Sequence, residues 1–89
     1  MTKNNSYAQE RIGFYEARLQ NDTINQLVEH CNTLASSLGW VAERSYFSTA
    51  LTNELTRRGI DLSAVCKDNA IRYIPIRYDS STRALQAID

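Results

Sequence analysis

The hydrophobic positions along the chain predict three helices followed by a β-rich segment. The clearest helix begins after Asp22-Thr23, where Gln26 stands three residues behind Thr23 in a capping-box pattern. Apolar residues then recur at helical spacing as far as Gly39, which is placed to end the helix, with Trp40 packing back on its last turn. The predicted core positions of this helix are Ile24, Leu27, Val28, Cys31, Leu34, Ala35 and Leu38.

Two further helices are predicted on either side of it. Ser6 followed by Gln9 is a second capping-box pattern, and the proline-free run from residue 7 to 20 predicts a first helix. Because only a few residues join it to the second helix, these two should pack antiparallel. A third helix is expected within residues 41–58, with Gly59 as its stop. The expected inward residues are Ala8, Ile12, Tyr15 and Leu19 in the first helix, and Phe47, Ala50, Leu51 and Leu55 in the third.

The segment IRYIPIRY, residues 71–78, contains Ile-Arg-Tyr twice, and strict alternation along a strand cannot place both copies on one face. Proline donates no ladder hydrogen bond, so within a strand it is confined to an edge, an end or a bulge. We therefore predict an edge strand over residues 70–78 with a bulge at Ile74-Pro75, which turns Arg72 and Arg77 outward. The residues facing inward would be Ile71, Tyr73, Ile76 and Tyr78.

The segments around this strand are also predicted. Asp61 should cap a short turn through Leu62 and Val65, and residues 67–69 should form a loop. The last eight residues are compatible with a return strand or a helical turn. The expected fold is a single α+β domain over residues 1–89, with a three-helix core (a helical hairpin plus a third helix) and a C-terminal strand or small β-hairpin. Residues 1–5 are expected to be a disordered N-terminus.

Composition narrows the classes of function. The 89 residues include ten basic and ten acidic side chains, a net charge of zero at pH 7, which disfavours a dedicated nucleic-acid binder. No stretch approaches the roughly 20 apolar residues that span a bilayer, and the first residues lack the apolar core of a signal peptide. We therefore expect a cytoplasmic protein with no membrane partner. Cys31 and Cys66 are expected to be reduced thiols.

Candidate catalytic chemistry is sparse. His30 is the only histidine, and it cannot pair with its neighbour Cys31, because adjacent helical side chains point about 100° apart. A pairing of His30 with Cys66 lacks a visible orienting group, and the Cys and His side chains are too few for a closed zinc site. The glutamates expected mainly on solvated helix faces are Glu10, Glu16, Glu29, Glu43 and Glu54. We expect neither an enzyme nor a cofactor or metal site.

The first helix presents the more informative surface. Tyr7, Arg11, Phe14 and Arg18 recur at i, i+4, i+7 and i+11 and form a second stripe beside the core positions, here called the aromatic–arginine stripe. Aromatic residues and arginine are enriched at protein interfaces. The alternative is that the two aromatic side chains widen the buried face while the arginines are solvated.

We predict from this stripe a small non-enzymatic accessory or regulatory protein, of regulator or inhibitor type, that binds another protein. A small domain also gains stability from a second copy, so we expect a homodimer through the stripe or through residues 71–78. Pro75 interrupts pairing through the strand and favours the helix surface. The expected partner-binding residues are Tyr7, Arg11, Phe14, Arg18, Arg72 and Arg77.

An alternative function comes from the stretch LASSLGWVAERSYFSTAL, residues 34–51. Through Ala35, Gly39 and the run Ser45-Tyr46-Phe47-Ser48, it resembles the helix-turn-helix of AraC-type transcription regulators, with one extra residue in the turn and without that family's second motif. The resemblance implies a DNA-binding regulator with a recognition helix in the major groove. An ordinary helical hairpin also contains such residues. The DNA-binding residues would be Arg44, Ser45, Ser48 and Thr49, with Arg57 and Arg58 on phosphates.

Overall fold

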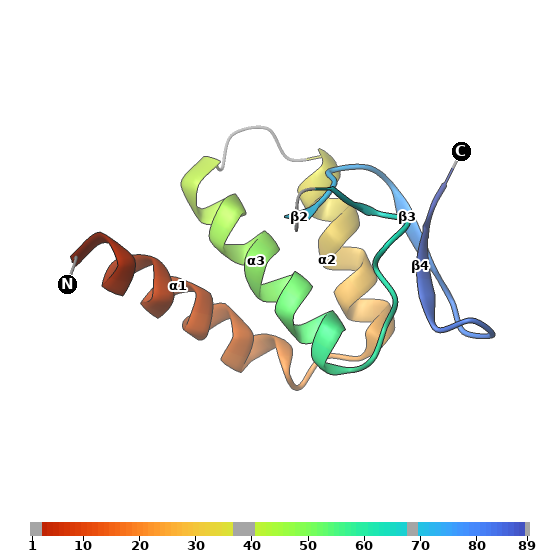
Figure 1. Ribbon diagram of the computed structural model, residues 1–89, viewed down its shortest axis with the longest axis horizontal. Coiled ribbons are helices and arrows are strands. Elements are labelled where there is room, and N and C mark those ends of the chain that lie inside the picture. Colours follow the sequence, from red (N-terminus) through yellow and green to blue (C-terminus); the bar gives the residue numbers. More distant parts are fainter. Residues whose placement is uncertain (1–2, 37–40, 68–69, 89) are drawn as a thin grey trace.

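The computed structural model describes residues 3–36, 41–67 and 70–88. Its helices are α1 (Lys3–Leu19), α2 (Ile24–Ser36) and α3 (Val41–Arg57), and its short strands are β1 (Cys66–Lys67), β2 (Ala70–Ile71), β3 (Ile76–Asp79) and β4 (Ala84–Ala87) (Figure 1). The predicted α+β class, with a three-helix core and a C-terminal β-hairpin, is confirmed. None of the helices in these ranges combines the length and the hydrophobicity that a membrane-spanning helix needs.

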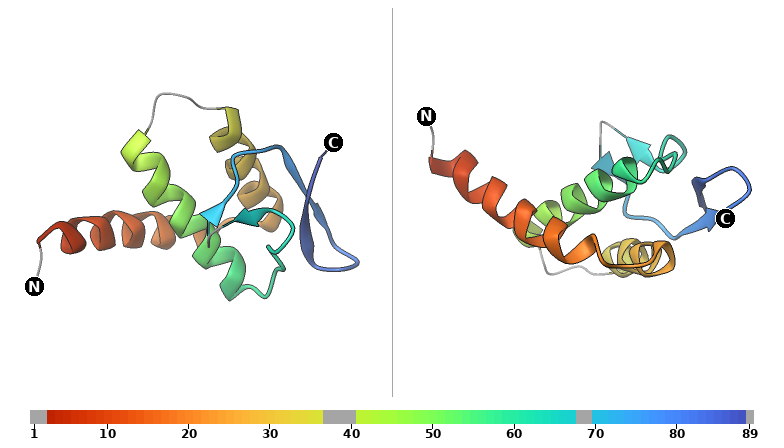
Figure 2. Two further views of the ribbon diagram at one scale, coloured as in Figure 1. Left: turned by 45° about the horizontal axis from the view of Figure 1, so that its top comes forward. Right: turned by 90° about the horizontal axis from the view of Figure 1, so that it is seen from below.

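Helix α3 lies between the other two helices. Figure 1 shows it between α1 and α2, and Figure 2 shows β1 and β2 on the side of α3 away from α2. The prediction that α1 and α2 pack against each other as an antiparallel helical hairpin is wrong. The main contact of α1 is with α3, and it includes an edge-to-face contact of Tyr7 with Tyr46. The short turn therefore brings α2 back toward α3 rather than along α1.

The predicted start of α2 is confirmed by its hydrogen bonds. The backbone N–H of Thr23 donates to Gln26 Oε1 at 2.8 Å, and the backbone N–H of Gln26 donates to Thr23 Oγ1 at 3.1 Å. This reciprocal pair is a capping box. In contrast, α1 begins at Lys3, ahead of the predicted start at Tyr7. The proposed end of α2 at Leu38, Gly39 and Trp40 lies outside the described residues.

Gly59 ends α3 as predicted. It adopts a left-handed conformation with φ of 78°, which glycine tolerates because it has no Cβ. The N–H of Gly59 donates to the carbonyl of Thr56 at 2.9 Å, and that of Ile60 donates to the carbonyl of Leu55 at 3.1 Å. This is a Schellman motif, and the two apolar residues that it brings together, Leu55 and Ile60, are both buried.

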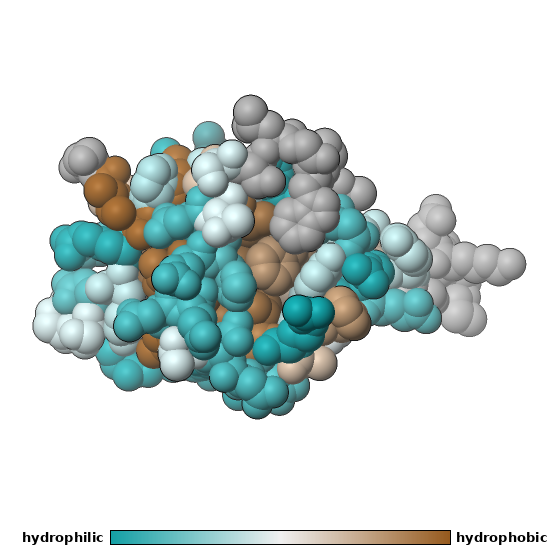
Figure 3. Space-filling model, turned by 180° about the vertical axis from the view of Figure 1, so that it is seen from behind, coloured by the Kyte–Doolittle hydropathy of each residue, from teal (hydrophilic) through white to brown (hydrophobic). Residues whose placement is uncertain are grey.

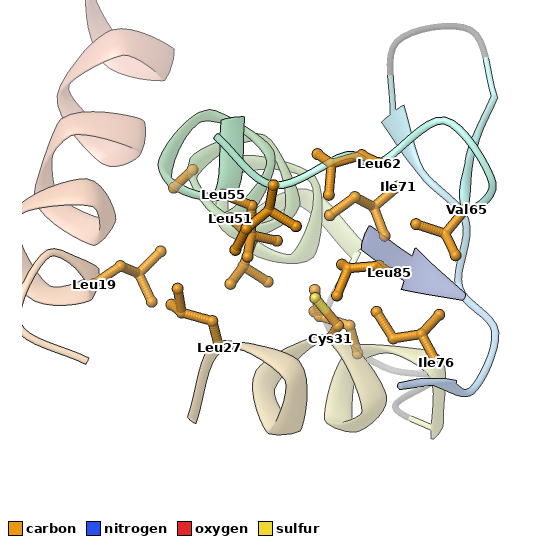
Figure 4. Packing of buried hydrophobic residues seen from close by; sticks show 13 residues of the cluster. Leu19, Leu27, Cys31, Leu51, Leu55, Leu62, Val65, Ile71, Ile76 and Leu85 are labelled. Atoms are coloured by element: carbon orange, nitrogen blue, oxygen red, sulfur yellow. The ribbon is translucent and has the colours of Figure 1, made fainter. Parts of the chain in front are cut away.

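One apolar cluster joins the three helices to the strands (Figure 4). Several predicted core residues are only partly buried at its edge, namely Ile12, Tyr15, Ile24, Val28 and Phe47. The cluster also takes in residues of the C-terminal region, so the strands are part of the core rather than an appendage. Its buried members are Leu19, Leu27, Cys31, Leu34, Ala50, Leu51, Leu55, Ile60, Leu62, Val65, Ile71, Ile76 and Leu85.

The prediction of one bulged strand over residues 70–78 is wrong. The chain forms two strands, β2 ending at Ile71 and β3 beginning at Ile76, and they belong to different antiparallel pairs, β1 with β2 and β3 with β4. A bulge would have kept both copies of Ile-Arg-Tyr in one ladder, whereas the four residues between β2 and β3 carry the chain from one pair to the other. Tyr73 lies in this connection and is 41% exposed, instead of facing the core.

The remaining expectations for this region are mostly met. Arg72 and Arg77 are exposed as predicted, and the last residues form the return strand β4. Asp61 Oδ1 accepts a hydrogen bond from the N–H of Ser63 at 2.9 Å, so the predicted turn is present. Lys67 belongs to β1 rather than to a loop, and residues 68–69 lie outside the described part.

The side chain of Asn32 in α2 forms hydrogen bonds with the backbone of β3, as a neighbouring strand would. Its Nδ2 donates to the carbonyl of Ile76 at 3.0 Å, and its Oδ1 accepts from the N–H of Ile76 at 2.8 Å. Ile76 is buried, so its backbone groups need these partners. The side chain of Asn32 thus positions β3 against α2.

We expect Asn32→Ala to lower the free energy of unfolding by about 1–3 kcal/mol, because it leaves a buried donor and acceptor without partners. Urea unfolding followed by circular dichroism would measure this loss. Thr33→Ala, at the next and exposed position of α2, is the matched control and should have almost no effect. Equal midpoints for the two variants would contradict the role assigned to Asn32.

Candidate protein-binding groove

A groove of about 610 Å³ opens where the three helices meet. Apolar and aromatic side chains form its floor, and polar side chains of α1, α2 and the turn between them form its rim. In Figure 3, which shows the molecule from behind, apolar surface is visible between hydrophilic side chains. The lining residues are Phe14, Tyr15, Arg18, Leu19, Asp22, Gln26, Glu29, His30 and Phe47.

A series of edge-to-face aromatic contacts builds the floor across all three helices. Phe14 contacts Tyr15 on α1 with ring centroids 5.4 Å apart, and Tyr15 contacts Phe47 of α3 at 5.0 Å. His30 of α2 contacts the same Phe47 at 5.4 Å. Edge-to-face packing is a favoured geometry for such rings. Phe47 therefore connects the two walls of the groove.

His30 is paired with a carboxylate at the rim. Its Nε2 lies 2.9 Å from Oδ2 of Asp22, which stands in the turn before α2. In the sequence, Asp22 was evident only as part of a helix-start signal, and His30 only as a possible partner of a cysteine. Residues eight apart around a helix start have no recognisable sequence pattern, so this pair could not be predicted.

The aromatic–arginine stripe forms part of the α1 wall. Its two aromatic side chains are half exposed, Tyr7 at 54% and Phe14 at 46%. The guanidinium carbons of Arg11 and Arg18 lie 4.9 and 5.5 Å from the Phe14 ring centroid. Cation–π contacts of this kind hold the ring in one place. The stripe therefore presents an aromatic surface next to the groove instead of simply widening the core.

Glu43 contradicts the expectation of a solvated glutamate. It is partly buried between α1 and α3, where Oε1 accepts hydrogen bonds from Arg11 Nη2 at 2.8 Å and from the Tyr15 hydroxyl at 2.5 Å. These hydrogen bonds lower the pKa of the Glu43 carboxyl, and the bond to Glu43 raises the pKa of Arg11. Arg11 is thus held in the fold by an ion pair.

Glu54 contradicts the same expectation more strongly, because it is only 4% exposed. It forms ion pairs with Arg57 and Arg58, the latter at 2.7 Å. Burial favours a raised pKa for Glu54, but the hydrogen bonds from the two arginines outweigh it and hold the pKa below its ordinary value. Arg58 also donates to the carbonyls of Leu19 at 3.1 Å and Gln20 at 3.2 Å, joining the end of α3 to the end of α1.

Most of the residues expected to contact DNA are buried or form contacts within the chain. Ser48 is buried at 4% exposure, so it cannot contact DNA in this fold, which corrects that part of the prediction. Ser45 and Thr49 are exposed, although the hydroxyl of Thr49 donates to the Ser45 carbonyl at 3.0 Å. The Arg44 guanidinium lies 4.6 Å from the centroid of the Tyr73 ring. Arg57 and Arg58 are paired with Glu54, so DNA binding remains a prediction that rests on the sequence resemblance.

The six expected partner-binding residues form two separate groups. Four make up the stripe on α1, while Arg72 follows β2 and Arg77 lies in β3. Figure 1 shows β3 toward the opposite end of the long axis from the N-terminus of α1. A partner seated on the groove would therefore contact the α1 group, and Arg77 would lie outside that contact.

Burial disfavours the thiolate form of both cysteines. Both cysteines are free, with Cys31 buried in the core. Burial, followed by the neighbouring Cys66, raises the pKa of Cys31 to about 12, and burial also raises the pKa of Cys66. A protonated thiol is a poor nucleophile. Among the described residues, no group of three His, Cys, Asp or Glu side chains could hold a metal ion.

Comparison with protein-family models, curated proteins and solved structures found no match. The geometry of the groove and of the stripe beside it is therefore the basis for the functional proposal.

Proposed function

We propose that this protein is a small non-enzymatic accessory or regulatory protein, of regulator or inhibitor type, that acts by binding another protein through the groove where the three helices meet and through the adjoining stripe. The observation that carries the proposal is Phe14, 46% exposed at the edge of a groove of about 610 Å³ with an aromatic floor. Aromatic anchors beside a concave apolar surface are typical of the residues that dominate binding energy in protein interfaces.

Contacts within the chain already position the side chains of the α1 wall. The ion pair of Arg11 with Glu43 and the ring contacts of Tyr15 with Phe47 hold the α1 wall on α3. A surface whose side chains are already fixed loses little conformational entropy on binding. Charged and polar groups at the rim, such as Arg18 and Glu29, would select the orientation of the partner rather than supply most of the affinity.

A photo-crosslinking amino acid at position 14 of the full chain, introduced in cells of the source organism, would capture the partner directly. The same group at Ser63, which is exposed in the turn after α3, is the control. We expect a reproducible adduct, identified by mass spectrometry, from position 14 and none from position 63. The same products from both positions, or no product from position 14, would contradict the proposal.

Substitution of both Tyr7 and Phe14 with serine should weaken association with the captured protein by about tenfold or more. Far-UV circular dichroism should stay nearly unchanged, because both side chains are half exposed in the free protein. Tyr73→Ser, which removes an exposed aromatic ring outside the helices, is the matched control and should bind normally. Unfolding of the double variant would instead place the two aromatic side chains in the core and count against a binding role.

A further inference from the structure

We infer that the protein that occupies this surface is a second copy of the chain, with the two α1 helices packed antiparallel across Phe14. This inference rests on the proposed function, since it identifies the partner of the same groove and stripe. It is supported by the charge pattern of α1, by the exposed ring at its centre and by the way the helix extends from the rest of the chain.

Two charged side chains on this face of α1 have no ion-pair partner among the described residues. Arg11 is neutralised by Glu43 at 2.8 Å, whereas Glu10 and Arg18 are exposed and form no such pair within residues 3–36, 41–67 and 70–88. Glu10 stands four residues before Phe14, and Arg18 stands four residues after it. Opposite charges therefore flank the exposed ring at equal spacing.

This spacing is self-complementary for antiparallel helices. Four helical residues correspond to about 6 Å along the axis and to about 40° around it, so Glu10 and Arg18 lie on either side of Phe14, each about 40° from it. A twofold axis next to Phe14 would bring Glu10 of one copy level with Arg18 of the other, and the symmetry would create this pair twice. The two Phe14 rings would meet at the axis, where apolar contact contributes most.

The shape and charge of the molecule allow this approach. Figure 1 shows the N-terminal part of α1 extending away from the rest of the chain, and Glu10, Phe14 and Arg18 are all exposed. The net charge of zero means that two copies do not repel each other overall. One helix face is a small interface, below the usual size of about 1,200 Å² or more for stable complexes, so the dimer should be weak, with a micromolar Kd.

Self-association of this kind would have a regulatory consequence. The dimer covers Phe14 and the edge of the groove, so the concentration of the chain would set the fraction of this surface that stays free.

The test is sedimentation equilibrium of the full chain over the micromolar range, combined with charge reversal. The wild type should show a reversible dimer. Glu10→Arg and Arg18→Glu should each weaken self-association by about tenfold or more, because each variant places like charges opposite one another. An equimolar mixture of the two variants should associate again, and so should the double variant Glu10→Arg/Arg18→Glu, because opposite charges then face each other.

The outcomes separate the inference from the proposed function. A wild type that is monomeric throughout this range overturns the inference, while a crosslinked adduct with a different protein at position 14 would leave the proposed function standing. A dimer that neither reversal weakens, or single variants that do not associate when mixed, also overturn it. If circular dichroism shows that a reversal unfolds the chain, Glu10→Gln and Arg18→Gln replace it, and unchanged self-association of those neutral variants overturns the inference.

Discussion

Replacing Leu34 with alanine should lower the free energy of unfolding by about 2–5 kcal/mol. Leu34 is 1% exposed on the inward face of α2, within the one apolar cluster that joins the helices to the strands. Alanine would lose the transfer free energy of the removed carbons and leave a cavity that the packed neighbours fill only partly. Since small domains are stable by only about 5–15 kcal/mol, the loss would be a large fraction of the total.

Thermal and urea unfolding would measure the effect of Leu34→Ala. Ile88→Ala is the matched control, because it removes a similar number of carbons from a side chain that is 50% exposed. The control should change the midpoint far less than the core variant does. A midpoint that Leu34→Ala does not change would show that Leu34 is not part of the core.

Glu54→Ala should be almost as disruptive, lowering the free energy of unfolding by about 2–4 kcal/mol. The substitution removes the carboxylate that holds Arg57 and Arg58 at the end of α3 and leaves the partly buried Arg58 guanidinium without its charge partner. Arg58 would also be less well placed to donate to the carbonyl of Leu19, which weakens the join between α3 and α1. Chemical denaturation at neutral pH would measure the loss, and Glu29→Ala, at an exposed glutamate of α2, should leave the stability nearly unchanged.

The contribution of Glu54 should also depend on pH in a definite direction. Its pKa in the folded protein lies below the ordinary value of 4.5, so the charged form stabilises the fold above that pH. As the pH falls from 4.5 through the folded pKa, the carboxylate binds a proton and this stabilisation is lost. The difference in stability between the wild type and Glu54→Ala should therefore be full at neutral pH and shrink in acid. A difference that stays constant down to strongly acidic pH would show that the charge of Glu54 does not stabilise the fold.

Local sequence chemistry determined where several elements begin and end. The capping box of Thr23 and Gln26 and the left-handed stop at Gly59 were predictable, because each depends on hydrogen bonds between residues only a few positions apart. The inward face of α2 was predictable for a similar reason, since helical spacing alone puts Leu27, Cys31 and Leu34 on one side. The α+β class follows from the same local signals, taken in order along the chain.

The tertiary structure alone decided how these elements meet. An apolar stripe indicates that a helix has a buried face, but it does not indicate which element packs against that face. The packing of α1 on α3 could therefore not be predicted. Glu43 looked like a solvated side chain because its partner, Arg11, comes from a different helix that only the fold brings close. The partners of Glu54 stand three and four residues later in the sequence, so for Glu54 it is the burial of the carboxylate that depends on the packing. The break between β2 and β3 likewise depends on which strands lie alongside. The groove exists only where three helices converge, so its aromatic floor reflects long-range packing and not any motif in the sequence.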